Sequence, residues 1–322
     1  MNYYNEIKNK LIDNEIYSKV KDYSKERHRV ITYFEIGRLL NEAGGKYGDN
    51  IIEEYSKKLV KEVGKKYNKR TLFRMKQFYN TFSAAKVSPV VTQLSWTHYI
   101  ILLSLNNYEK INYYVKQVIV RNLSKRELEQ IIKNKEYERL PQETKNKLKF
   151  EEKSNVQDFV KNPIIIKNNS NYEIITEKIL QKLILEDIPC FLEELGEGFS
   201  FVKNEYKIKL GDRYNYIDIL LYNIKFKCYV VVELKITELK KEYIGQIQTY
   251  MNYIDKNIKT LEEDKTIGII ICKKDNEFVM EYCSDERILS REYLFNWLNT
   301  ILILINSYVI IFDTWRYWYV QK

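Results

Sequence analysis

The two neighbouring stretches YNYIDILLY (residues 214–222) and CYVVVELK (residues 228–235) place charged side chains inside runs that otherwise predict buried β-strands. Aromatic and β-branched residues dominate both runs, and these residue types favour strands. The intervening residues 223–227 are few and polar enough to reverse the chain. The two runs are therefore predicted to form an antiparallel hairpin.

This hairpin is predicted to bring three charged side chains together. A turn centred between Lys225 and Phe226 places Asp218 opposite Glu233. Strand side chains alternate between faces, so Glu233 and Lys235 share one face. Opposed carboxylates repel, and their burial without compensation is costly. A bound cation removes that cost, and carboxylates with waters and substrate phosphates are typical Mg²⁺ ligands. The alternative is an aspartate at a strand end and an exposed Glu233–Lys235 edge pair.

These residues resemble the PD-(D/E)xK nuclease superfamily, and within it the bacterial YhcG-type proteins. The similarity covers residues 191–283, in FLEELGEGFSFV (191–202), YIDILLY (216–222), CYVVVELK (228–235) and TIGIIICK (266–273). The resemblance implies a helical N-terminal domain followed by a restriction-endonuclease-like αβββαβ core, in the α+β or α/β class. It also implies metal-dependent nuclease activity.

The same element order is predicted from the residues themselves. Residues 188–195 have helical character and precede Gly196 and Gly198, which suit a helix C-terminus. Residues 199–203 and 206–210 alternate like two strands before a turn at Gly211 and Asp212. After the hairpin, residues 239–258 show helical spacing, and residues 267–272 predict a central strand.

The resemblance extends the site beyond the hairpin. Glu194 corresponds to the acid that completes the metal site, with Glu193 as the fallback. Gln246 and Tyr250 stand four residues apart, on one helix face, and match the Q-x-x-x-Y element of the RecB-like branch. The predicted catalytic set is therefore Glu194, Asp218, Glu233, Lys235, Gln246 and Tyr250, with Asp218, Glu233 and Glu194 as metal ligands. Relatives commonly carry Gly, Arg and Gln at positions 203–205, where this chain has Lys203, Asn204 and Glu205. This departure puts substrate preference in question.

Charge divides the chain into a basic and a mildly acidic half. Residues 1–150 hold 30 Lys and Arg against 17 Asp and Glu, whereas residues 151–322 hold 23 against 27. Nine of the basic residues fall in residues 57–76, where Glu62 is the one acid. Such clustering favours phosphate contacts. The candidate nucleic-acid-binding residues are Lys65, Lys66, Lys69, Arg70, Arg74 and Lys76, and the alternative is a solvated lysine face.

The 322 residues, 45% of them hydrophobic, are enough for two domains. We expect a basic helical domain (residues 1–150), a linker (151–172), the nuclease domain (173–295) and an apolar tail (296–322). In the first domain, helices are predicted at residues 31–40 and 51–63, punctuated by Gly44-Gly45 and Gly64. Asn68 is a predicted N-cap, and Ser124 with Glu127 a predicted capping box. The tail is expected to pack as a terminal strand or helix or to bind a partner. Membrane association through the tail is the weaker alternative, because its apolar run falls short of the roughly 20 residues that span a bilayer.

The remaining composition favours a cytoplasmic enzyme. The four cysteines are widely spaced, which indicates reduced thiols and neither a zinc site nor a disulfide framework. The start of the chain is polar, without the pattern of a signal peptide, and His98 is interpreted as structural. We therefore expect a DNA nuclease that uses Mg²⁺, with Mn²⁺ as the alternative ion. A catalytically silent nucleic-acid-binding or complex-forming protein is the second hypothesis, and RNA as substrate and a homodimer stay open.

Overall fold

The computed structural model describes residues 2–19, 24–47, 50–83, 94–150, 155–170 and 172–296. The chain divides into two compact units, Met1–Glu138 and Arg139–Lys322. Residues 297–322, which hold nearly all of the predicted apolar tail, lie outside the described residues. Among the helices that are described, none combines the length and apolarity needed to cross a bilayer.

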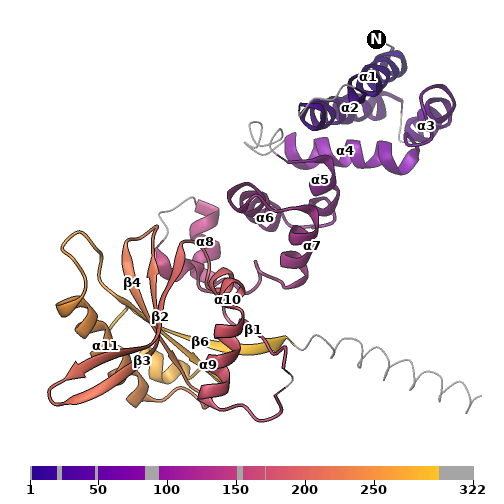
Figure 1. The fold of residues 1–322 in the computed structure, drawn as a ribbon. Coiled ribbons are helices and arrows are strands. Elements are labelled where there is room, and N and C mark those ends of the chain that lie inside the picture. The colour runs from indigo at the N-terminus through magenta and orange to yellow at the C-terminus, as the bar shows by residue number, and fades with distance from the viewer. Residues whose placement is uncertain are drawn as a thin grey trace, which may run out of the picture. The chain divides into compact units, whose positions relative to one another are not determined.

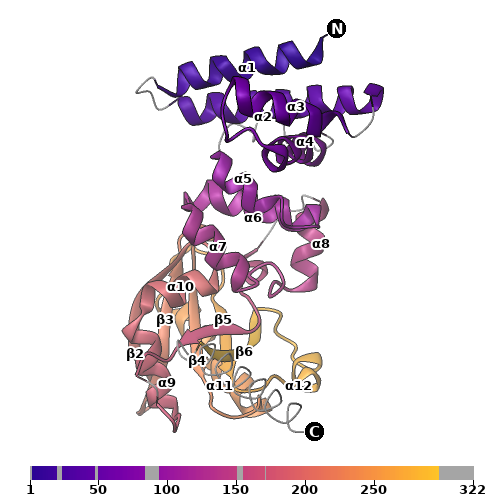
Figure 2. The same ribbon diagram turned by 90° about the vertical axis from the view of Figure 1, so that its right-hand side faces the viewer.

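The first unit is helical, as predicted. Its helices are α1 (Tyr3–Ser18), α2 (Lys25–Tyr47), α3 (Ile51–Glu62), α4 (Lys69–Ser83), α5 (Trp96–Leu102), α6 (Tyr108–Arg121) and α7 (Lys125–Lys133). Figure 2 shows α1 lying along α2, and α2 also packs against α4. Gly37 permits this second contact, because a Cβ atom there would lie 2.1 Å from the Met75 carbonyl oxygen.

The predicted helix caps are present in this unit. The side chain of Asn68 accepts a hydrogen bond from the Thr71 N–H at 3.1 Å at the start of α4. Ser124 and Glu127 form the capping box of α7. One boundary prediction was wrong: helix α2 continues through Gly44 and Gly45 to Tyr47. A glycine inside a helix costs only about 1 kcal/mol, which the packing of α2 outweighs.

The second unit is a six-stranded mixed sheet with helices on both faces (Figure 1). Its strands are β1 (Ile164–Lys167), β2 (Phe199–Leu210), β3 (Arg213–Asn223), β4 (Cys228–Leu234), β5 (Ile267–Cys272) and β6 (Ile288–Asn296). Its helices are α8 (Gln142–Phe150), the 3₁₀ helix η2 (Val156–Phe159), α9 (Glu177–Glu186), α10 (Ile188–Leu195), α11 (Lys241–Asn257) and α12 (Glu277–Glu281). The segment α10–β2–β3–β4–α11–β5 has the predicted αβββαβ order.

The sheet order is β1-β6-β5-β4-β3-β2. Strands β2, β3 and β4 pair antiparallel, whereas β4, β5, β6 and β1 pair parallel. Strand β1 falls inside the range 151–172 that the sequence predicted as a linker. Strand β2 joins the two ranges, 199–203 and 206–210, that were predicted to alternate like strands. A register shift between Phe201 and Lys203 and a positive φ of 46° at Glu205 interrupt the alternation between them without ending the strand.

Alternate residues of β4 bury against opposite layers. Val230 and Val232 pack with residues of α9 and α10, including Leu180, Leu183 and Phe191. Val231 packs on the other face with residues of α11, including Ile247, Met251 and Ile254. Gly268 of β5 lets α11 approach closely, because a Cβ atom there would lie 2.6 Å from the Met251 sulfur. This double layer fixes the end of β4, where the charged residues lie.

Candidate active site

The β3–β4 hairpin has the predicted register. Asn223 pairs with Cys228 and Ile219 with Val232, which centres the turn between Lys225 and Phe226. Asp218 and Glu233 are therefore adjacent at the end of this ladder. The Asp218 N–H donates to Glu233 Oε1 at 3.5 Å, and the Leu234 N–H donates to Asp218 Oδ2 at 2.8 Å. The strand backbone thus holds the Asp218 carboxylate against Glu233.

Burial makes this pair electrostatically unusual. Glu233 is only 1% exposed. This burial and the neighbouring Asp218 carboxylate raise the pKa of Glu233 to about 8. Burial also raises the pKa of Asp218, although the Leu234 N–H and the Lys235 charge act in the opposite direction. Two negative charges on this pair are therefore unfavourable unless a cation offsets them.

Lys235 shares the face of Glu233, as predicted. Its Nζ lies 3.3 Å from Glu233 Oε2 and 5.2 Å from the centre of the Tyr243 ring. Burial alone would lower the pKa of Lys235, but the Glu233, Glu177 and Asp218 carboxylates outweigh it and raise the pKa. Lys235 is consequently a buried, charged ammonium group beside the carboxylate pair.

Helix α11 carries Gln246 and Tyr250 to the same site. Gln246 Nε2 donates to Tyr250 Oη at 3.1 Å. Tyr250 is buried, and its pKa is raised by that burial, with smaller contributions from the Glu233 and Asp218 charges. The predicted Q-x-x-x-Y pair therefore forms a hydrogen-bonded unit beside the carboxylates.

Glu194 lies in a different environment. Arg139 binds it through two bonds, Nη1 to Oε2 at 2.5 Å and Nη2 to Oε1 at 3.0 Å. The Ile165 N–H of β1 donates to Oε2 at 3.0 Å. Although burial would raise the pKa of Glu194, Arg139 and Lys161 lower it. Both carboxylate oxygens are thus already occupied, and the structure does not bring Glu194 to the Asp218–Glu233 pair. Its neighbour Glu193 is exposed.

Helix α9 supplies an acidic residue that the sequence interpretation missed. Gln181 Nε2 donates to the Asp218 carbonyl oxygen at 2.9 Å, which places this face of α9 beside the site. Glu177 stands one turn earlier on the same face, and its charge acts on both Asp218 and Lys235. A sequence signal was available: Thr176 caps α9 through the Ile179 N–H at 3.2 Å, and Leu180, Leu183 and Ile184 give it helical apolar spacing.

The donor set fits a hard divalent cation. Two carboxylates lie together, one of them almost fully buried with a raised pKa, and Mg²⁺ commonly takes one or two carboxylates with waters and phosphate oxygens. Within the residues that the structure describes, no three Asp, Glu, His or Cys side chains are grouped closely enough to hold a metal. Glu177 is exposed, and its charge acts on Asp218 and Lys235, while the charge of the exposed Glu205 also acts on Asp218.

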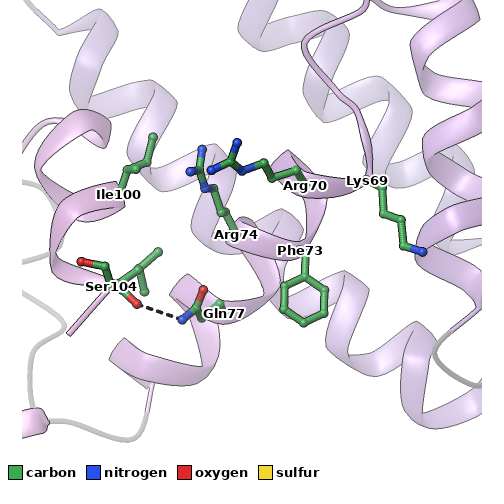
Figure 3. Close-up of a pocket in the computed structure, with 8 residues that line it drawn as sticks. Lys69, Arg70, Phe73, Arg74, Gln77, Ile100 and Ser104 are labelled. Atoms are coloured by element: carbon green, nitrogen blue, oxygen red, sulfur yellow. Dashed lines mark hydrogen bonds between the residues drawn. The ribbon is translucent and has the colours of Figure 1, made fainter. Parts of the chain in front are cut away.

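The six predicted nucleic-acid-binding residues of the first unit lie in different surroundings. Lys66 pairs with Glu15 at 2.5 Å and Lys69 with Glu53 at 2.7 Å. Lys69 also lines, together with Arg70 and Arg74, a pocket between α4 and α5 (Figure 3). The two other predicted residues, Lys65 and Lys76, are not among the residues that line this pocket. His98, interpreted as structural, accepts a hydrogen bond from the Ser95 N–H at 3.3 Å through Nδ1 in the cap of α5.

Comparisons with known proteins give the same two-part division. Residues 157–295 match the YhcG PDDEXK nuclease domain, and residues 11–139 match the DUF1016 N-terminal domain. The chain is 23% identical over 283 residues to the YhcG protein of Escherichia coli (strain K12), covering 75% of this chain and 76% of that protein.

Solved structures with local similarity include two endonuclease structures. A repair endonuclease from Pyrococcus abyssi is 19% identical with a TM-score of 0.28, over 38% of this chain and 48% of that one. EndoMS in a complex with dsDNA is 21% identical with a TM-score of 0.29, over 38% of this chain and 47% of that one. This chain thus spans about half the length of each. With both of its domains matched by their family models, the chain belongs to the YhcG-type PD-(D/E)xK nuclease family.

Proposed function

We propose that this protein hydrolyses DNA phosphodiester bonds with the help of a divalent metal ion. The observation that carries the proposal is the Asp218–Glu233 pair at the end of a hairpin of a nuclease-family domain. Glu233 is buried there beside Lys235, whose Nζ lies 3.3 Å from Glu233 Oε2. Two carboxylates and an ammonium group in one buried site suit a reaction at a negatively charged phosphate. In this reaction a water oxygen bonds to phosphorus, and the bond from phosphorus to one sugar oxygen breaks.

Asp218 and Glu233 would hold Mg²⁺, or Mn²⁺ as the alternative. When bound, the ion would lower the pKa of a coordinated water and offset charge on the phosphate. Glu177, on the adjoining face of α9, is the proposed third acidic residue in place of Glu194. The backbone contact from Leu234 orients Asp218, so that this carboxylate is fixed before substrate arrives.

Lys235 is proposed to stabilise charge on the phosphate or to orient the attacking water. Its raised pKa keeps the ammonium group protonated at neutral pH, so it acts as a hydrogen-bond donor and a charge. Gln246 and Tyr250 are proposed to position the substrate backbone or the catalytic side chains. Their mutual hydrogen bond fixes the orientation of both.

The basic N-terminal unit is proposed to bind DNA through Lys65, Lys66, Lys69, Arg70, Arg74 and Lys76. We further propose a cytoplasmic location. The four cysteines, Cys190, Cys228, Cys272 and Cys283, are all free thiols, which suits a reducing compartment.

Cleavage assays on the purified full-length chain test the proposal. Labelled single-stranded, duplex and branched DNA, together with RNA, are incubated with Mg²⁺, Mn²⁺ or a chelator. We expect metal-dependent cleavage that disappears in Asp218→Ala and in Lys235→Ala. Asp212→Ala and Lys241→Ala are the matched controls, because both side chains are exposed.

Unchanged cleavage in Asp218→Ala and Lys235→Ala would contradict the proposed site. DNA binding without cleavage of any substrate would instead support the alternative, a catalytically silent protein that binds nucleic acid.

A further inference from the structure

A pocket in the first unit opens between α4 and the C-terminal end of α5 (Figure 3). Its volume is about 600 Å³, within the usual range of small-ligand sites. Helix α4 contributes Arg70, Phe73, Arg74 and Gln77, whose spacing places them on one helix face. Ile100 and Leu103 form an apolar wall. The opposite face of α4 is buried in the helical core through Leu72, Met75, Phe78 and Phe82.

The two arginines carry uncompensated charge. Arg70 and Arg74 stand one helical turn apart on the same face of α4, and Figure 3 shows Lys69 pointing away from them. Lys69 is paired with Glu53, whereas Arg70 and Arg74 have no carboxylate partner in the part of the chain that the structure describes. Like charges four residues apart on a helix repel. A phosphate would remove this repulsion, because guanidinium groups match its oxygens in a bidentate geometry.

Phe73 adds an aromatic surface to this charge. Its side chain is 58% exposed, whereas Phe78 and Phe82 on the same helix are 0% and 2% exposed. An exposed phenyl ring in the same pocket as two guanidinium groups offers a face on which a base can stack.

Gln77 gives the pocket a fixed polar group. Its Nε2 donates to the Leu103 carbonyl oxygen at 3.0 Å, which orients the side-chain amide. Among the described residues nothing donates to the Gln77 Oε1. This oxygen is therefore available to accept a hydrogen bond from a base N–H.

We propose that this pocket binds an unpaired nucleotide of a DNA strand. The base stacks on Phe73, its phosphate lies against Arg70 and Arg74, and Gln77 accepts a hydrogen bond from the base. A base inside a duplex is already stacked on both sides and cannot present its face to a phenyl ring, so single-stranded, gapped or branched DNA is favoured. The inference rests on the proposed function in taking DNA as the ligand.

Binding without cleavage tests the inference. The full-length chain is titrated into a labelled oligodeoxythymidylate and, separately, a labelled duplex, in a chelating buffer, with fluorescence anisotropy as the readout. Phe73→Ala is expected to weaken single-strand binding about tenfold and duplex binding much less, because one stacked base is lost. Phe73→Trp restores single-strand binding. Phe278→Ala is the matched control, since Phe278 is 77% exposed and lies in α12 of the other unit.

The arginines are tested through the salt dependence of binding. Arg70→Gln and Arg74→Gln are each expected to reduce the magnitude of the slope of log affinity against log salt concentration by about one. This change corresponds to the loss of one phosphate contact. Arg126→Gln, an exposed arginine on α7, leaves the slope unchanged.

The pocket assignment is overturned if Phe73→Ala changes single-strand and duplex binding equally, or changes neither. Since no cleavage is needed, the two proposals fail separately. If single-strand binding depends on Phe73 but the protein cleaves no substrate, only the nuclease proposal is contradicted. Cleavage with single-strand binding insensitive to Phe73 contradicts the pocket alone.

Discussion

Two buried carboxylates of the same domain, Glu194 and Glu233, have opposite electrostatics. Arg139 and the Ile165 N–H occupy both oxygens of Glu194, and the pKa of Glu194 is lowered. Glu233 faces Asp218, with Lys235 as its one close cation among the described residues, and its pKa is raised to about 8.

The difference separates a structural carboxylate from a reactive one. The charge of Glu194 is already neutralised inside the protein, so it stabilises the fold and has no need of a ligand. The charge of the Asp218–Glu233 pair is only partly neutralised, so a cation from outside is stabilising there. Four experiments test this contrast.

The largest effect is expected on stability, from removal of the guanidinium group that neutralises Glu194. Arg139→Ala leaves a buried, unpaired carboxylate and should lower the free energy of unfolding by about 3–5 kcal/mol. Urea denaturation followed by circular dichroism measures this loss. In the double variant Arg139→Met/Glu194→Met, most of the loss should be recovered, because both members of the buried ion pair are removed. A double variant as unstable as Arg139→Ala would contradict the ion-pair explanation.

Glu233→Gln should affect activity and stability in opposite directions. Cleavage should fall on the order of 10²–10³-fold, comparable to the loss of one strong electrostatic contact in other active sites. Stability of the metal-free protein near pH 7 should not fall, because the raised pKa of about 8 keeps Glu233 mostly protonated and glutamine resembles that neutral form. Single-turnover cleavage and urea denaturation in chelating buffer measure the two effects. A destabilised variant would show that Glu233 is as well compensated as Glu194.

The variants Glu177→Gln and Glu194→Gln together test which of the two glutamates is the third acidic residue of the site. Glu177→Gln should lower cleavage about 10- to 100-fold and leave stability nearly unchanged, because Glu177 is exposed and acts on Asp218 from α9. Glu194→Gln should instead lower stability, with cleavage per folded molecule retained. The reverse pattern in parallel assays would return Glu194 to the metal site.

The smallest effect is the pH dependence that Glu194 contributes. Its folded-state pKa lies below the ordinary value, so its stabilising contribution is complete above that value and is lost as the pH falls through the folded pKa. Stability of the wild type should therefore decline more steeply below about pH 4.5 than that of Arg139→Met/Glu194→Met. Urea denaturation at a series of acidic pH values measures this decline. The same decline of unfolding free energy with pH in both proteins would argue against a lowered pKa of Glu194.

The hairpin could be predicted from the sequence because its information is local. The turn position and the period of two together fixed Asp218 opposite Glu233, and the register agrees. Helix α10 and strand β5 were predicted for the same reason. Glycines follow the end of α10, and an uninterrupted apolar run forms β5.

The third acidic residue could not be predicted in the same way. Glu194 and Glu177 both stand on helices before β2, and neighbouring sequence does not distinguish them. The deciding partner of Glu194 is Arg139, which lies 55 residues away in the sequence. Only the folded chain reveals that this carboxylate is already bound.

The sequence did not predict the pocket beside α4, although some of its lining residues belong to the predicted basic cluster. The basic cluster predicted from the sequence includes Arg70 and Arg74. Counting charges could not show that these two lack a carboxylate partner among the described residues, whereas Lys66 and Lys69 have one. That difference depends on ion pairs with Glu15 and Glu53, which belong to α1 and α3. Phe73 belonged to a predicted helix, but its exposure depends on which face of α4 the core covers.

Strand β1 has a practical consequence for dissecting the molecule. It pairs in parallel with β6 over residues 164–167, and the Ile165 N–H binds Glu194. A fragment that starts at residue 173 therefore lacks an edge strand, and it also lacks Arg139. Loss of activity in such a truncation would report misfolding and would say nothing about catalysis. Deletion mapping of the nuclease unit is informative only for fragments that begin at Arg139 or earlier.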